Sequence, residues 1–317
     1  MHALTTATVP VAPRWRRAVL VIAVSLALAG CQTAASTSQQ ASRSQAAAVQ
    51  VAALPALPAP VGAMPGSELA LAPQGNAQRR AHAAIVVDAA TGAVLHEKDA
   101  DALRYPASLT KMMTLYLLFD ALSEGRVNVD TPLLISAKAA SQPPARIGLK
   151  AGGRLTVSQA IQALAVKSAN DVAIAVAENL GGSEAAFAAQ MTAKARSLGM
   201  RNTRFVNASG LPDPQQVTTA RDMAILSRAL KSRHASRASA FTARSFTYEG
   251  RTYQATNNLL GRVAGVDGIK TGYIRDSGYN LAASAHRGGR SVIAVVFGGE
   301  SEGARDRQVT ELIEQYL

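Results

Sequence analysis

Cysteine is nearly absent: the 317-residue sequence contains one, Cys31. A single thiol excludes a disulfide within the chain and a metal site built from several cysteine ligands. Histidines are also few, and none of the five follows the H-x-x-x-H or H-E-x-x-H spacing that is typical of zinc sites. We therefore expect no catalytic metal and no other cofactor.

Aromatic residues make up only 4% of the sequence, whereas hydrophobic residues reach 48%, much of it alanine. That share is ample for a packed core, and 317 residues suffice for one large domain or two small ones. The net charge of +12 is compatible with anionic lipid, an acidic wall polymer or nucleic acid as a partner. No basic stripe with interleaved aromatics is present, so we expect no nucleic-acid partner and interpret the charge as a solvated surface.

Residues 1–30 have the pattern of a targeting signal. Three arginines precede an apolar stretch, 18–29, that is too short to span a membrane, and Cys31 follows soon after it. This resembles a bacterial lipoprotein signal peptide, in which Cys31 becomes the lipid-carrying N-terminus; the alternative is an ordinary secretory signal with an incidental cysteine. The resemblance implies a lipid anchor on the periplasmic side of the envelope. Gln32, in place of an aspartate that would resemble an inner-membrane retention signal, favours the outer membrane.

Residues 31–78 consist mainly of Ala, Ser, Gln and Pro, with almost no charge. Such a stretch cannot bury enough apolar surface to order itself. We predict that it is a disordered linker between the lipid and a folded domain. The folded domain is predicted to span 79–317.

The folded part combines strand and helix patterns. Two short β-prone runs, 83–89 and 93–98, flank a Thr-Gly turn and predict a hairpin. Near the C-terminus, 279–286 and 291–298 predict two antiparallel strands joined across a Gly-Gly pair, and 302–317 predicts a closing helix. Together they favour one antiparallel sheet covered by helices, an α+β fold.

Ser108 and Lys111 stand at the head of a long apolar helical pattern that ends at Gly125. Three residues apart, they share one face of the first turn. A serine becomes nucleophilic when a base takes its proton, and a lysine can be that base if burial and neighbouring cations leave it neutral. The helix N-terminus also offers N–H groups to an oxyanion. The pair outlines an acyl-transfer site. S-x-x-K alone favours instead a solvated Ser and Lys at a helix start, because a chance match is expected in a chain of this length.

Ser168 and Asn170 form an S-x-N segment between two apolar helical patterns, one opened by a capping box at Thr156 and Gln159. A polar connection between buried helices needs partners for its side chains. The alternative is that Ser168 or Asn170 simply caps a helix.

Lys270, Thr271 and Gly272 form a K-T-G sequence on a predicted strand. Lys270 offers a cation, Thr271 a hydroxyl for a carboxylate, and Gly272 leaves room for substrate backbone beside the strand. Alternatively, Gly272 marks a bulge and Lys270 is a solvated edge charge.

The three motifs S-x-x-K, S-x-N and K-T-G each occur once and in this order. Together with the phrases PASLTKMMT, KSANDVA, TTARDMAIL, GIKTGYI, YNLAASA and VVFGG, they give the chain a pattern that resembles the serine penicillin-binding proteins, most closely the low-molecular-mass D-alanyl-D-alanine carboxypeptidases. The resemblance runs from about residue 81 to the C-terminus. It implies a β-lactamase/transpeptidase-like fold, peptidoglycan stem peptides as substrates and β-lactams as covalent inhibitors.

The resemblance also implies the catalytic roles. Ser108 attacks the carbonyl of the penultimate D-Ala and forms an acyl-enzyme, which water then hydrolyses. Lys111 activates Ser108, and Lys270 keeps Lys111 neutral by like-charge repulsion. Ser168 passes the proton toward the leaving amine.

The substrate-binding roles follow in the same way. Asn170 bonds a backbone carbonyl of the substrate, Thr271 of the K-T-G strand binds the terminal carboxylate beside Gly272, and the N–H groups of Ser108 and Tyr273 form the oxyanion hole.

The chain departs from the family pattern in two places. Family members often hold the substrate carboxylate with an arginine on the strand after K-T-G; the matching position here is Ser291, and Arg290 is one residue away, which reverses the face of a strand. Arg290 is therefore the weaker candidate. Many relatives also carry a further β-rich domain and a C-terminal anchor, and we interpret the Cys31 lipid as replacing that anchor.

Three other functions compete. A DD-endopeptidase that cuts wall crosslinks would use the same residues. A class A β-lactamase needs a glutamate that directs a deacylating water, and no glutamate between Asn170 and Lys270 stands in a recognisable context for it. A catalytically silent wall-binding lipoprotein would not need an activated nucleophile.

Overall fold

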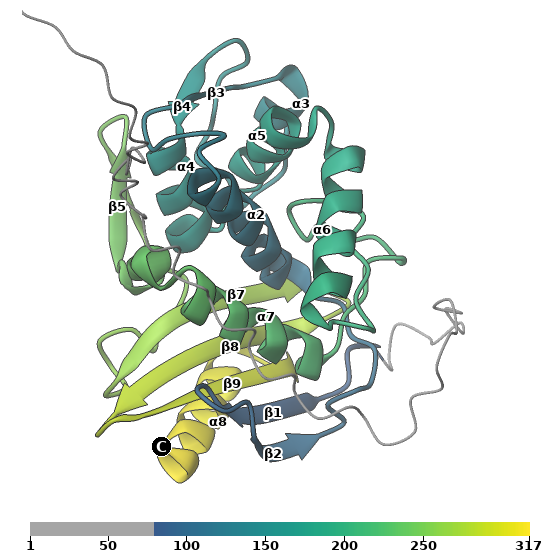
Figure 1. Cartoon of the computed structure of the whole chain (residues 1–317), viewed down its shortest axis with the longest axis vertical. Helices are drawn as coiled ribbons and strands as arrows, with labels where there is room; N and C mark the ends of the chain where they lie inside the picture. Colours follow the sequence, from purple (N-terminus) through teal and green to yellow (C-terminus); the bar gives the residue numbers. More distant parts are fainter. Residues whose placement is uncertain (1–78) are drawn as a thin grey trace, which may run out of the picture. The chain divides into compact units, whose positions relative to one another are not determined.

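The structure, a computed structural model, describes residues 79–317; the predicted signal peptide, the linker and Cys31 lie outside the described residues. The described part contains a five-stranded antiparallel sheet in the order β2-β1-β9-β8-β7 (Figure 1). Its strands are β1 (Ala83–Asp88), β2 (Val94–Lys98), β7 (Val266–Ile274), β8 (Gly278–Arg287) and β9 (Arg290–Gly299). The first hairpin and the last strands thus share one sheet, which confirms the α+β prediction.

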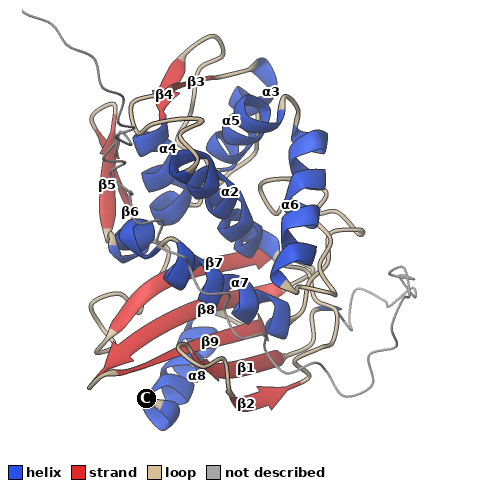
Figure 2. Cartoon of the chain, in the orientation of Figure 1, coloured by secondary structure: helices blue, strands red, loops and turns tan. Residues whose placement is uncertain are grey.

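Both faces of this sheet are buried. Successive residues of a strand point to opposite faces, so Ile85 packs in the larger hydrophobic core and its neighbour Val86 in the smaller one. The helix α8 (Glu302–Tyr316) covers the smaller core, with Ile313 fully buried, and α7 (Ala220–Arg233) packs against β1 and β9 from the other side (Figure 2). Burial on both faces explains why β1 and β9 are apolar along most of their length.

A cluster of helices stands beside the β7 edge of the sheet (Figure 1). The central helix α2 contacts α5, α6 and the two short turns η1 and η2, and two short hairpins flank the cluster. The helical elements are η1, a 3₁₀ turn (Ala107–Thr110), α2 (Lys111–Ser123), α3 (Ala137–Ala140), α4 (Val157–Gln162), η2, a π-helical turn (Ala163–Lys167), α5 (Asn170–Gly181), α6 (Glu184–Leu198) and η3, a 3₁₀ segment (Ala235–Thr242); the hairpins pair β3 (Pro132–Leu134) with β4 (Arg154–Thr156), and β5 (Ser245–Tyr248) with β6 (Arg251–Gln254).

Local sequence signals set the limits of these helices. Thr156 and Gln159 form the predicted capping box at the start of α4, with both reciprocal hydrogen bonds present. Gly125 follows α2 with a φ of +70°, a left-handed conformation that glycine adopts without a steric penalty. The residues of α2 from Lys111 to Phe119 are all buried, so the side chains at its N-terminal end lie in the interior of the domain.

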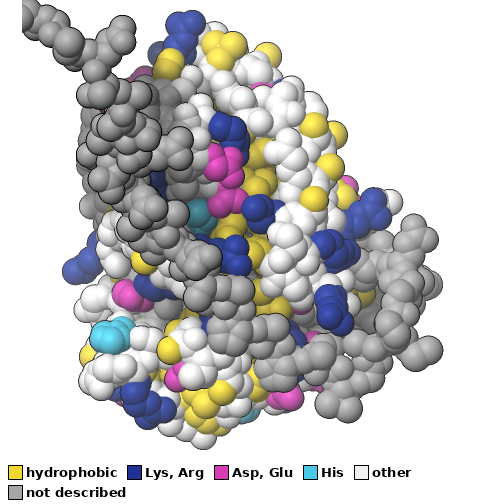
Figure 3. All heavy atoms as spheres, in the orientation of Figure 1, with side chains coloured by type: hydrophobic (Ala, Val, Ile, Leu, Met, Phe, Trp, Pro, Cys, Tyr) yellow, Lys and Arg dark blue, Asp and Glu magenta, His cyan; other side chains and the backbone are white. Residues whose placement is uncertain are grey.

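No helix among residues 79–317 has the length and apolar character needed to cross a bilayer. On the face that Figure 3 shows, Lys and Arg side chains are scattered among other side chains and form no continuous stripe. This distribution fits the interpretation of the positive charge as a solvated surface.

Candidate active site

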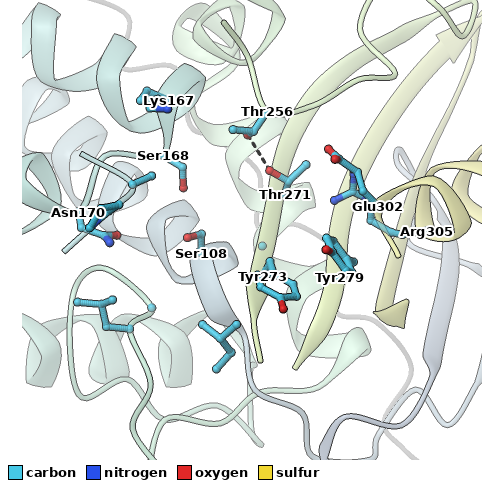
Figure 4. A pocket seen from close by; sticks show the side chains of 16 residues that line it. Ser108, Lys167, Ser168, Asn170, Thr256, Thr271, Tyr273, Tyr279, Glu302 and Arg305 are labelled. Carbon is cyan, nitrogen blue, oxygen red and sulfur yellow. Dashed lines mark hydrogen bonds and ion pairs between the residues drawn. The ribbon is translucent and has the colours of Figure 1, made fainter. Parts of the chain in front are cut away.

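A cavity of about 540 Å³ opens between the helical cluster and the edge strand β7 (Figure 4). Its walls come from parts of the chain that are far apart in sequence: η1, the end of η2, the start of α5 and the middle of β7. Six predicted site residues line it, namely Ser108, Ser168, Asn170, Thr271, Gly272 and Tyr273. The fold therefore brings the three motifs to one place.

Ser108 sits on the short 3₁₀ turn η1, directly before α2. The preceding residue, Ala107, has a φ of +47°, which is uncommon for a side chain other than glycine. Gly210 packs against this turn so closely that a Cβ there would lie 1.9 Å from the carbonyl oxygen of Ala107. The loop around Gly210 thus supports the backbone that presents Ser108 to the cavity.

Lys111 is fully buried, with 0% of its surface exposed. Its Nζ lies 3.2 Å from Ser108 Oγ, 2.7 Å from Asn170 Oδ1 and 2.5 Å from the carbonyl oxygen of Ser209. Asn170 Oδ1 and the Ser209 carbonyl can only accept hydrogen bonds. A neutral amine has two protons and one lone pair, so it satisfies both acceptors and directs the lone pair at the Ser108 hydroxyl.

Two physical effects favour that neutral amine. Burial, and after it the positive charge of Lys270, lowers the pKa of Lys111 well below its usual value of 10.5; Asp171 opposes the shift. Lys270 itself is only 1% exposed. Its burial and the neighbouring Arg305 lower its pKa to about 7. The like-charge effect expected from sequence is therefore present, but burial is the larger cause.

Neither Ser168 nor Asn170 caps a helix through its side chain. Ser168 follows η2 in a left-handed conformation, φ 62° and ψ 38°, and its buried Oγ has no hydrogen-bond partner among the described residues. The N-cap position of α5 is Ala169, with no side-chain capping bond. Asn170 instead accepts from Lys111 and donates through Nδ2 to the carbonyl oxygen of Pro143 at 3.0 Å. The capping alternative is therefore wrong, and both side chains face the site.

The next residue, Asp171, holds the loop that forms one wall of the cavity. Its buried carboxylate accepts hydrogen bonds from the backbone N–H groups of Ile147, Gly148 and Leu149. The backbone N–H of Asn170 donates to the Ala145 carbonyl oxygen at 2.7 Å. The Asp171 carboxylate and the backbone of Asn170 thus both hold this loop in place beside the S-x-N segment.

On β7, Lys270 points inward and donates to the carbonyl oxygen of Thr271 at 3.0 Å, so it is not a solvated edge charge. The Thr271 hydroxyl donates to Thr256 Oγ1 at 2.7 Å (Figure 4). A Cβ on Gly272 would lie 3.1 Å from both Ser108 N and Pro106 O. Gly272 therefore permits close approach of β7 to the serine turn, and the irregularity of this strand lies elsewhere, between Val266 and Gly268.

Tyr273 follows Gly272 at the mouth of the cavity and is 52% exposed. Its ring lies against Tyr279 of β8, with the ring centroids 4.4 Å apart. This pair forms an aromatic wall on the side of the cavity away from Lys167 (Figure 4).

Arg290 does not reach this site, so its predicted role as a substrate ligand is wrong. It is exposed at the start of β9 and donates to the carbonyl oxygen of Tyr316. The strand register explains the error: Lys270 pairs with Ala282, and Ala282 pairs with Val295, so the K-T-G level of β9 is at Val295. Five residues of extended strand span roughly 17 Å.

Among residues 79–317, no group of three or more His, Cys, Asp or Glu side chains is arranged to hold a metal ion. The chemistry available at the cavity is that of a buried amine, two serine hydroxyls and backbone N–H groups.

Comparison with known proteins shows the family to which the chain belongs. The profile of the D-alanyl-D-alanine carboxypeptidases, peptidase family S11, matches residues 70–301. The chain belongs to this family. It is 35% identical over 243 residues to D-alanyl-D-alanine carboxypeptidase DacF of Bacillus subtilis, and 36% identical over 246 residues to DacA of Escherichia coli. These matches cover 74% and 75% of this chain but 61% of each relative, so the chain matches about three fifths of their length.

Solved structures of family members have the same fold. Penicillin binding protein 5 from Haemophilus influenzae superimposes with a TM-score of 0.72 at 30% identity, covering 77% of this chain and 71% of that one. Penicillin-Binding Protein D2 from Listeria monocytogenes, in its cefotaxime-bound form, gives a TM-score of 0.68 at 32% identity and covers 76% and 98%. The expected penicillin-binding-protein fold is confirmed.

Several residues of this site were missed in the sequence. The segment 205–214 contains none of the three motifs, yet it supplies the Ser209 carbonyl to Lys111 and places Gly210 against Ala107. Asp171 and Thr256 were also missed. The N-A-S-G sequence, rich in turn-forming residues, was the only signal at 205–214, and it indicates a turn without indicating what the turn contacts.

Proposed function

We propose that this chain is a serine D-Ala-D-Ala carboxypeptidase that removes the terminal D-Ala of peptidoglycan stem peptides. One observation carries the proposal: the buried Nζ of Lys111 lies within hydrogen-bond distance of Ser108 Oγ while two obligate acceptors occupy its other directions. A nucleophile and a base in contact, with the base oriented by further groups, form the basic unit of covalent acyl transfer. Family membership supports the substrate class.

In the proposed reaction, Ser108 Oγ attacks the carbonyl carbon of the penultimate D-Ala as its proton passes to Lys111. The negative charge that develops on the carbonyl oxygen is stabilised by the N–H groups of Ser108 and Tyr273, which the close packing of Gly272 on the serine turn favours. The C–N bond then breaks as Ser168 donates its proton to the leaving amine and takes the proton that Lys111 received from Ser108, which leaves Lys111 neutral again. Water attacks the ester, returning Ser108 to its free form and releasing the shortened peptide.

Asn170 and Thr271 are proposed to hold the substrate on either side of the scissile bond. Asn170 lies on the helical wall, where its amide reaches the substrate backbone next to the nucleophile. Thr271 lies on the opposite wall, and with Gly272 it lets the peptide run along the edge of β7. The exposed edge of a sheet offers the unpaired N–H and C=O groups that an extended peptide needs.

β-Lactams are proposed to acylate Ser108 because their strained amide and carboxylate mimic the D-Ala-D-Ala terminus. The printed descriptions of related structures, with cefotaxime and with ampicillin bound to the Listeria protein, support this. A DD-endopeptidase acting on crosslinks would use the same catalytic residues and is the second candidate. A silent wall-binding protein is disfavoured, because binding alone gives no reason to bury two lysines beside a serine.

The protein is proposed to act on the periplasmic side of the cell envelope, anchored in the outer membrane by lipid on Cys31, with 31–78 as the tether. The sequence pattern around Cys31 supports this, and the family acts on the cell wall. Cys31→Ser should yield an unlipidated protein that leaves the membrane fraction. Continued membrane association of this variant would contradict the anchor.

Digestion of purified peptidoglycan tests the activity. The wild-type chain should release free D-Ala and convert pentapeptide stems to tetrapeptides, whereas Ser108→Ala should release none. If crosslinked dimers disappear and no free D-Ala is released, the chain is a DD-endopeptidase and the carboxypeptidase proposal is wrong. If no product changes, both enzymatic functions are refuted and the wall-binding protein is the remaining candidate.

A further inference from the structure

The proposed substrate ends in a carboxylate, and the cavity must recognise that negative charge. The expected cation, Arg290, lies at the far end of β9. Thr271 contributes a hydroxyl, which is neutral. The described lining of the cavity contains two cationic side chains in addition to these groups, Lys167 and Arg305.

Arg305 is already engaged. It is 2% exposed, its Nε and Nη2 donate to Asp306 Oδ1, and its Nη1 donates to the carbonyl oxygen of Asn280. Glu302 Oε1 lies 3.6 Å from its Nη2. With two carboxylates beside it, Arg305 presents little net positive charge to an incoming anion.

Lys167 is in a different situation. It is half-buried at the C-terminal end of η2, and within residues 79–317 its ammonium forms no ion pair. Its nearest described partner is the ring of Tyr253, with Nζ 5.9 Å from the centroid. An aromatic face attracts a cation without neutralising its charge. Lys167 is therefore a cation of the cavity wall that no described carboxylate pairs with.

Backbone contacts place Lys167 beside the hydroxyl pair on the opposite wall. The N–H of Thr256 donates to the carbonyl oxygen of Val166 at 3.2 Å, so residues 166–167 and Thr256 are neighbours. The Thr256 hydroxyl in turn contacts that of Thr271 at 2.7 Å. Figure 4 shows Lys167 and Thr256 at the same end of the cavity, with Tyr273 at the other.

This end is where the leaving group must lie. In the proposed mechanism Ser168 protonates the leaving amine, so the departing D-Ala lies next to Ser168, with its carboxylate carbon two bonds from the amine nitrogen. Lys167 precedes Ser168 directly. Lys167, the two threonine hydroxyls and the departing carboxylate then lie at the same end of the cavity, and a hydrogen bond from an ammonium to a carboxylate is stronger than one between neutral groups.

We propose that Lys167, together with the Thr256 and Thr271 hydroxyls, binds the α-carboxylate of the terminal D-Ala and takes the part expected of Arg290. This inference rests on the proposed function. It makes Lys167 a specificity residue: it distinguishes a free C-terminus from an amidated or esterified one, and it takes no part in proton transfer.

The test uses the full chain and two matched pairs of probes: a diacyl-L-Lys-D-Ala-D-Ala peptide with its C-terminal amide, and benzylpenicillin with its methyl ester. Lys167→Met should lower kcat/KM for the acid peptide about 10- to 100-fold, mainly through KM, and change that for the amide by less than about threefold. Lys167→Arg should restore the preference for the acid. Lys98→Met, an exposed lysine on β2 outside the cavity lining, should match the wild type.

An equal loss for acid and amide would show that Lys167 only supports the fold and would overturn the inference, as would an unchanged acid preference in Lys167→Met. The penicillin pair separates this failure from failure of the proposed function. If the wild type releases no D-Ala but is acylated by benzylpenicillin, the acid-to-ester ratio of acylation rates still decides the role of Lys167. If neither probe reacts, the inference and the proposed function are both refuted.

Discussion

The Nζ of Lys111 lies 2.7 Å from Oδ1 of Asn170, and this contact joins the first motif to the second. It is a contact between an amine and a neutral amide, in a pocket where both residues are buried. The neutrality of the amide matters, because a carboxylate in its place would pair with the ammonium form and hold the base in its inactive state.

Asn170→Asp tests this relationship with almost no change in shape. The new carboxylate should raise the pKa of Lys111, so that acylation at neutral pH falls by roughly 100-fold or more. The rate should recover partly at higher pH. The second-order rate constant for acylation by benzylpenicillin, measured against pH, provides the readout. Asn128→Asp on an exposed turn serves as the control, and the account fails if both variants behave alike.

Lys270→Met should shift the acid limb of the same pH profile. Lys270 carries positive charge below its pKa of about 7 and thereby lowers the pKa of Lys111. Removing that charge raises the pKa of Lys111, so the limb moves to higher pH. Burial is the larger cause of the low pKa of Lys111, and the limb should therefore remain below the usual lysine range. An unmoved limb, with only a uniform loss of rate, would show that Lys270 does not tune the base.

Gly210→Ala should disrupt the serine turn. The new Cβ would lie 1.9 Å from the carbonyl oxygen of Ala107, and the backbone on both sides would have to move. Gly182→Ala is a matched control, because its φ of +74° is similar to the +84° of Gly210 while no heavy atom lies within 4 Å of its Cβ position. The control should lose about 1 kcal/mol of unfolding free energy and keep its acylation rate. Gly210→Ala should lose more stability than the control and most of its acylation rate. If the two variants lose stability and rate equally, Gly210 does not support the turn that carries Ser108.

Asp222 should make the stability of the domain depend on pH. Burial raises the pKa of its carboxyl from 3.8 to about 6, against hydrogen bonds from Thr203 and Asn202 that lower it. A carboxyl with a raised native pKa stabilises the folded state fully below pH 4, and this contribution, about 3 kcal/mol, is lost as pH rises through 6.

Asp222→Asn mimics the protonated carboxyl and should remove that loss. Urea unfolding at pH 4.5 and pH 7.5 gives the comparison: the wild type should lose stability between these values relative to the variant. A difference of the opposite sign would show that the ionised carboxylate is the stabilised form.

Much of the fold was predictable because its signals are local. The hairpin at 83–98, the capping box at Thr156, the Gly-Gly turn between β8 and β9 and the terminal helix each follow from neighbouring residues. The three motifs could likewise be recognised in the sequence, and each of them contributes residues to the cavity lining. What Lys111 touches was not predictable, since the Ser209 carbonyl comes from a backbone group 98 residues away.

Arg290 shows the limit of counting along a strand. The alternation of faces is a local property, and it already argued against this residue. The level of a residue across a sheet depends on the register of two strand pairs, and here that register places Val295 of β9 level with Lys270, on the far side of β8. Lys167 could not be predicted as a site residue, because its position in the cavity depends on a contact between η2 and Thr256, 89 residues further along the chain.

The central claim is that Ser108 is a nucleophile activated by Lys111, and covalent labelling tests it most directly. The wild-type chain is incubated with benzylpenicillin, and the intact mass and the modified peptide are determined by mass spectrometry. The account predicts a single adduct with the mass of the intact antibiotic on the peptide that contains Ser108, absent in Ser108→Ala and strongly slowed in Lys111→Met. No adduct on the wild type, or an adduct on any other residue, would contradict it.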